Sequence, residues 1–63
     1  MKGLEAKNSK QLDICLRMLY SEKVRFIVEV RETNKQKIVY WIGAIVDEQK
    51  FKALKEKYRI LIS

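Results

Sequence analysis

The sequence predicts a single small α+β domain, in which an antiparallel sheet carries two helices on one of its faces. Two observations lead to this prediction. The spacing of apolar residues changes along the chain from a helical period to a strand period and back. The chain also has only 63 residues, with no proline and 48% hydrophobic residues. Because a chain this short buries only about 60% of the surface that it exposes when unfolded, we expect one core and one domain, residues 1–63.

Residues 1–7 leave two alternatives open. Leu4 and Ala6 alternate with Gly3, Glu5 and Lys7, a period that permits a short edge strand. A frayed, basic N-terminus is equally compatible with this charged segment.

A helix is predicted over residues 9–21, because apolar residues recur there at helical spacing. Asn8, with Gln11 three residues later, resembles a capping box, and Ser9 is the alternative N-cap. The face predicted to be buried consists of Leu12, Cys15, Leu16 and Leu19, widened by Ile14, Met18 and Tyr20.

Two strands are predicted next, over residues 24–32 and 37–46, with a turn at residues 33–36. In the first strand, Phe26, Val28 and Val30 alternate with charged residues, which is the period of a half-buried strand. The second strand is almost wholly apolar, which favours a central strand or one with a partner on its outer face. Asn34 is a turn residue that tolerates a positive φ.

The second helix is predicted to begin at Asp47 and Glu48, because acidic side chains favour a helix N-terminus. The apolar residues at helical spacing that form its inward face are Phe51, Leu54 and Tyr58.

The C-terminal segment again leaves two alternatives. Leu61 and Ile62 continue the helical stripe, whereas the β-branched Ile60 and Ile62 favour a short strand over residues 59–62, which is the interpretation we adopt. With a strand at each end, the element order is (β)αββαβ, the connectivity of a ferredoxin-like split βαβ domain. We therefore predict a small ferredoxin-like fold with an antiparallel sheet and two helices on one face.

The length of the hairpin loop decides which side chains share a face of the sheet. A loop of two or four residues places Val28 opposite Trp41, so that Trp41 and Val39 lie under the helices; we expect this to be the better core. A loop of three residues shifts the second strand by one residue. Trp41 and Val39 then move to the outer face, and the residues that join the core are Ile38, Tyr40 and Ile42.

In either register, the face without helices keeps large apolar residues, an aromatic residue and arginines, a composition typical of an interaction surface. We therefore expect a non-enzymatic binding or regulatory module that presents this face to a protein partner or to a second copy of itself. A homodimer is favoured, because self-association is the remaining means of stabilising so small a chain. The candidate partner-binding residues are Ile38, Tyr40, Trp41 and Ile42, with Arg25 and Arg31 at the rim.

The net charge of +6 suggests an alternative function, sequence-tolerant binding of RNA or single-stranded DNA. The candidate residues are Lys35, Lys37, Lys52 and Lys55. The run Tyr40–Gly43 has neither the spacing nor the glycines of the RRM motif. The lysines are also scattered, so a solvated basic surface is the favoured interpretation.

Composition disfavours several other classes of function. The sequence has no histidine and one cysteine, which argues against His-based catalysis, most metal sites and an internal disulfide. Cys15 lies on the apolar side of its helix, so we expect it to behave as a small hydrophobe. We expect no enzymatic activity, cofactor or small-molecule substrate. No apolar run approaches the roughly 18 residues that span a bilayer, and the charged N-terminal segment does not resemble a secretory signal. We therefore expect a cytoplasmic protein with no membrane partner.

Overall fold

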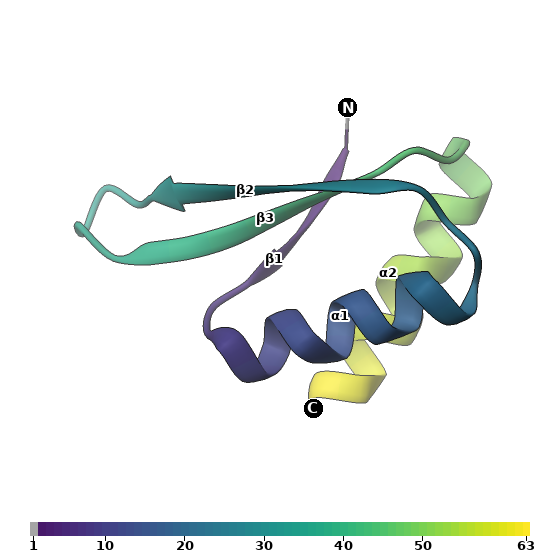
Figure 1. Cartoon of the computed structure of the whole chain (residues 1–63), viewed down its shortest axis with the longest axis horizontal. Coiled ribbons are helices and arrows are strands. Elements are labelled where there is room, and N and C mark those ends of the chain that lie inside the picture. Colours follow the sequence, from purple (N-terminus) through teal and green to yellow (C-terminus); the bar gives the residue numbers. More distant parts are fainter. Residues whose placement is uncertain (1) are drawn as a thin grey trace.

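The computed structural model describes residues 2–63; Met1, which belongs to the predicted segment 1–7, lies outside them. Strands β1 (Gly3–Ala6), β2 (Phe26–Glu32) and β3 (Ile38–Ala44) form an antiparallel sheet in the order β1-β3-β2. Helices α1 (Ser9–Ser21) and α2 (Glu48–Ile62) lie together on one side of this sheet (Figure 1). The predicted small α+β architecture is confirmed, and so is the strand alternative for the N-terminal segment.

The predicted fourth strand is wrong, so the full ferredoxin-like (β)αββαβ order is not reached. Helix α2 continues without interruption to Ile62, and residues 59–62 are helical. The β-branched residues do not end the helix, because no glycine or proline interrupts it and each residue added to an existing helix gains a further hydrogen bond. β1 and β2 both run antiparallel to β3, which lies between them. The β1–α1–β2 unit is therefore a split βαβ unit.

The hairpin loop has three residues, so of the two registers that the sequence left open, the one based on a loop of two or four residues is excluded. The Thr33 N–H donates to the Lys37 carbonyl at 2.8 Å, and the Gln36 N–H donates to the Thr33 carbonyl at 2.9 Å. Gln36, rather than Asn34, has a positive φ, of 60°. This combination is the turn followed by a left-handed residue that is typical of three-residue hairpin loops. In this register Val28 lies opposite Ile42.

The core lies between the helices and one face of the sheet. Its members are Leu4, Ala6, Ile42 and Ala44 from the strands, Cys15, Met18 and Leu19 from α1, and Phe51, Leu54 and Tyr58 from α2. The predicted core that contained Trp41 and Val39 is corrected, because the three-residue loop turns both side chains to the opposite face. Tyr20 is 83% exposed, since it lies about 100° further around the helix than the buried Leu19.

Side-chain and backbone caps set the ends of α1. Asn8, rather than Ser9, is the N-cap, and its side chain accepts a hydrogen bond from the Gln11 N–H at 2.9 Å. At the other end, Lys23 has a φ of 57°. The Lys23 N–H donates to the Tyr20 carbonyl and the Val24 N–H to the Leu19 carbonyl, which is the Schellman motif formed without glycine. The chain is thereby turned directly into β2.

Candidate interaction surface

The β2–β3 hairpin extends beyond the helices, and its loop is the part of the sheet furthest from α2 (Figure 1). β2 and β3 have seven residues each, whereas β1 has four. On the helix side of this overhang, three aliphatic side chains are exposed: Val28 at 40%, Val30 at 66% and Ile38 at 63%. We call these three residues the hairpin patch. Tyr40, at its border, is half-buried because it packs against the core.

The outer edge of β2 has unpaired backbone groups. The Ile45 N–H donates to the Arg25 carbonyl at 2.9 Å, and the Thr33 N–H donates to the Lys37 carbonyl. Residues 25 and 33 therefore bond to the β3 side, and so do the odd-numbered residues between them, because hydrogen bonding alternates along an antiparallel strand. The residues that direct their N–H and C=O groups to the open edge are Phe26, Val28, Val30 and Glu32.

The other edge of the sheet is partly covered. The Tyr58 hydroxyl, on α2, donates to the Glu5 carbonyl of β1 at 2.9 Å. β1 is also short, with four residues, and short edge strands are poor templates for pairing. β2 is therefore the strand edge best suited to accept another chain.

The face of the sheet without helices is covered by its own side chains. The Arg31 guanidinium lies 4.1 Å from the centre of the Trp41 ring, and its Nη2 donates to Glu29 Oε2 at 2.9 Å. Trp41 also lies across Gly3, so that a Cβ at Gly3 would overlap the indole. This face is thus a layer of aromatic and charged groups with Val39 buried beneath them and Ile27 exposed at 41%.

The structure does not bring the predicted partner-binding residues onto one face. Ile38 and Tyr40 lie on the helix side, whereas Trp41 and Arg31 lie on the other face. Arg25 is exposed just before β2. Ile42 is fully buried, so it belongs to the core and is removed from the candidate surface.

Sequence reasoning missed Val28 and Val30, which it placed under the helices. The signal that points to them is the length of the two hairpin strands, which the helices cover only in part.

The predicted nucleic-acid-binding lysines fall into two separate groups. Lys35 and Lys37 line a hollow beside the hairpin loop together with Lys7, which the sequence reasoning did not select. Lys52 and Lys55 line a second hollow between β1 and α2. Among residues 2–63, no carboxylate lies within 4.0 Å of these five ammonium groups. The first hollow therefore gathers three unpaired cations, with Glu5 also in its lining.

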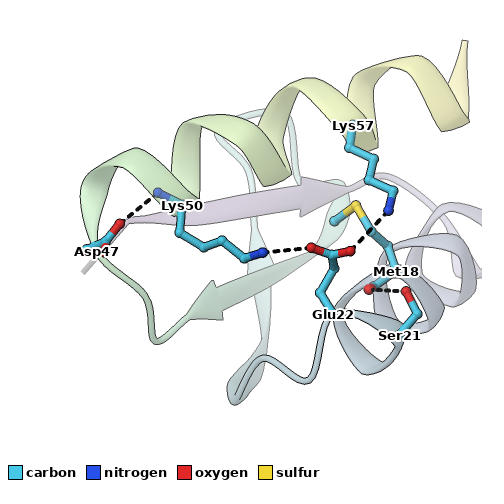
Figure 2. Close-up of polar contacts among 6 residues, drawn as sticks. All are labelled: Met18, Ser21, Glu22, Asp47, Lys50 and Lys57. Atoms are coloured by element: carbon cyan, nitrogen blue, oxygen red, sulfur yellow. Dashed lines mark hydrogen bonds and ion pairs between the residues drawn. The ribbon is translucent and has the colours of Figure 1, made fainter.

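A polar cluster centred on Glu22 joins the two helices (Figure 2). Its Oε1 accepts from the Lys50 ammonium at 2.7 Å and its Oε2 from the Lys57 ammonium at 3.2 Å. These hydrogen bonds, Lys50 first, lower the pKa of Glu22. Asp47 caps α2 by accepting from the Lys50 N–H at 2.7 Å. Two α2 lysines are thus used to hold α1 against α2.

The only cysteine is unsuited to nucleophilic chemistry. Cys15 is fully buried, and desolvation raises the pKa of its thiol to about 11. Because the thiolate is the reactive form, the interpretation of Cys15 as a small hydrophobe is confirmed.

Comparison of the chain with protein-family models, with curated proteins and with solved structures finds no match. In the described residues 2–63, neither helix has the length and apolar character needed to cross a membrane.

Proposed function

We propose that the protein is a small non-enzymatic binding or regulatory module whose β2–β3 hairpin docks on another protein chain, in the first instance a second copy of itself. The observation that carries the proposal is the hairpin patch, which exposes Val28, Val30 and Ile38 beside an unpaired strand edge. Contiguous exposed apolar groups mark interaction sites on small proteins. An open strand edge pairs readily with another strand.

The buried thiol supports two further parts of this proposal. A free cysteine with a raised pKa offers no ready nucleophile, which favours binding over catalysis. An unpaired cysteine also fits a reducing compartment, so we place the module in the cytoplasm.

The test is the solution mass, measured by sedimentation equilibrium at low and at moderate salt. The chain has a mass of 7.5 kDa, so we expect twice this value, 15 kDa, for the wild-type protein. Val30→Lys places a charge in the hairpin patch and should reduce the mass to 7.5 kDa. Ile60→Lys is the matched control, because Ile60 is similarly exposed, at 58% against 66% for Val30, but lies on α2. Circular dichroism confirms that both variants are folded.

Two results would overturn the proposal. One is a wild-type mass of 7.5 kDa at the highest soluble concentration. The other is an equal loss of mass in Val30→Lys and Ile60→Lys, which would show that added charge acts without regard to position.

A second candidate function is sequence-tolerant binding of RNA or single-stranded DNA, favoured by the three unpaired lysines that line the hollow beside the hairpin loop. Cations that neutralise phosphates release counterions, so binding should weaken steeply with salt. We expect the double variant Lys35→Glu/Lys37→Glu to lose binding of a single-stranded oligonucleotide in a fluorescence anisotropy titration. The matched control, Lys52→Glu/Lys55→Glu, changes the same charge in the other hollow. Equal losses in the two variants would contradict a site at the loop.

A further inference from the structure

We infer, on the basis of the proposed self-association, that two copies pair their β2 edges antiparallel about a two-fold axis. The axis lies midway between the Val30 residues of the two copies, which we call an axis through Val30. The two three-stranded sheets then form one continuous six-stranded sheet, with all four helices on the same side. The inference adds to the proposed function the strand, the register and the residues in contact.

The backbone groups at the edge permit this pairing. Val28, Val30 and Glu32 direct their N–H and C=O groups away from β3, as the alternation along β2 requires. An axis through Val30 places Val30 opposite the second copy's Val30 and Val28 opposite the second copy's Glu32. Each of these pairs exchanges backbone hydrogen bonds, because both members face the edge.

Charge complementarity selects Val30 as the centre. An axis through Val30 places Glu29 opposite the second copy's Arg31, twice, and these two residues already form an ion pair within one chain, at 2.9 Å. An axis through Glu29 places two carboxylates directly opposite, and an axis through Arg31 places two guanidinium groups opposite. An axis through Val28 places Arg25 opposite Arg31. Like charges directly across a strand pair are destabilising.

An axis through Glu32 again places two carboxylates directly opposite, and an axis through Phe26 pairs Glu29 with Lys23, where the backbone is not extended because φ is 57°. An axis through Ile27 is the remaining alternative. It pairs Arg25 with Glu29, but it also places Lys23 opposite Arg31 and requires extended backbone at Lys23, whose φ is 57°. It further leaves the most exposed residue of the hairpin patch, Val30, outside the centre of the contact. The axis through Val30 keeps the hydrogen-bonded pairs, residues 28–32, inside β2, which spans Phe26–Glu32.

In this arrangement, different side chains meet on the two faces of the shared sheet. On the helix side, the two Val30 side chains meet between the two Tyr40 rings, which neighbour Val30 on β3. Because the strands are antiparallel, the loop end of each β2 lies beside the first residues of the other copy's β2, and Ile38, on β3, lies one strand further from the second copy. On the opposite side, two Glu29 and two Arg31 side chains form one cluster next to Trp41.

The experiment uses two single variants that are complementary to each other. Glu29→Arg places two arginines opposite two arginines, and Arg31→Glu places two glutamates opposite two glutamates. We expect each variant alone to sediment at 7.5 kDa and their equimolar mixture to return to 15 kDa, because a mixed pair restores both opposite-charge contacts. Asp13→Arg is the control: it breaks another exposed ion pair, with Arg17 on α1, and should leave the mass at 15 kDa.

The result that overturns this register differs from the result that overturns the proposed function. If the wild type is dimeric and Val30→Lys is monomeric, but the mixture of Glu29→Arg and Arg31→Glu stays at 7.5 kDa, the register is wrong and the self-association stands. The register is also wrong if either single variant remains dimeric. A monomeric wild type overturns both.

Amide hydrogen exchange of the wild type gives a second readout that needs no substitution. The amides of Val28, Val30 and Glu32 should become protected as protein concentration rises, because only the second copy bonds them. The amides of Ile27 and Glu29, which face β3, should be protected at every concentration. Exchange at Val30 that does not depend on concentration would overturn the inference.

Discussion

Tyr58→Phe removes one hydroxyl group and measures how strongly α2 is held to β1. Tyr58 is buried, and its hydroxyl donates to the Glu5 carbonyl at 2.9 Å. Such a hydrogen bond contributes about 1 kcal/mol net. Because Glu5 is exposed, water can donate a hydrogen bond to its carbonyl in the variant, so we expect the free energy of unfolding to fall by about 0.5–1 kcal/mol. In a domain of this size, that loss lowers the Tm by about 2–8 °C.

The assay is thermal unfolding followed by circular dichroism, at one fixed protein concentration, because self-association makes the Tm depend on concentration. Tyr20→Phe is the matched control, since the side chain of Tyr20 is 83% exposed. The Tm of this variant should equal that of the wild type. Equal Tm values for Tyr58→Phe and Tyr20→Phe would refute the reasoning.

The pH dependence provides an internal check of the same prediction. Burial, and then the nearby Cys15 and Glu5, raise the pKa of Tyr58 from 10.0 to about 12. The folded protein therefore keeps a proton that the unfolded chain has released. The stabilisation is complete below pH 10.0 and is lost as the pH rises to about 12. The Tyr58→Phe variant lacks this titration, so its Tm should fall less steeply than that of the wild type over this range.

Three other predictions concern the outer face, the helix junction and the loop. Gly3→Val should displace the indole of Trp41, the only tryptophan, costing about 1–3 kcal/mol and shifting the fluorescence emission to the red; an unchanged spectrum would contradict the contact. Glu22→Gln should lower the Tm at neutral pH, and the difference should vanish as the pH falls through the lowered pKa of Glu22; a difference that persists in acid would rule out the ion pairs as its cause. Gln36→Gly should increase the free energy of unfolding by about 0.5–1 kcal/mol and so raise the urea midpoint, because φ at Gln36 is 60°. Lys35→Gly, at a residue with no positive φ, should not raise it.

The two helices and the two hairpin strands are predictable because each has a clear local signal, whereas the alternation in residues 1–7 left both a strand and a frayed N-terminus open. The cap at Asn8 and the apolar period of α1 lie within one segment, and the structure confirms both. The inward face of α2, which includes Phe51 and Leu54, follows from the same helical period. Local spacing therefore predicts an element well where that element buries one face.

The C-terminal segment was mispredicted because two local signals compete there. Ile60 and Ile62 prefer strands, but they follow directly on an established helix. A strand at this point also needs a partner edge. Tyr58 brings α2 across the β1 edge through its bond to Glu5, so the helix occupies the place where a fourth strand would pair. Such an outcome depends on tertiary contacts that no local pattern contains.

The hairpin register depends on a single residue of loop length, and the candidate surface depends on the register. In the loop of two or four residues, Trp41 would face the helices, and Ile38 and Tyr40 would lie beside Arg31. The observed three-residue loop instead places Ile38 and Tyr40 on the helix side, on the same face as Val28 and Val30. Val28 and Val30 face the helix side, while Glu29 and Arg31 face the other side. A second copy can therefore meet Val30 at the centre of one side of the shared edge and opposite charges on the other. The left-handed backbone at Gln36 sets the register of β3, whereas the alternation along β2 itself makes the edge self-complementary.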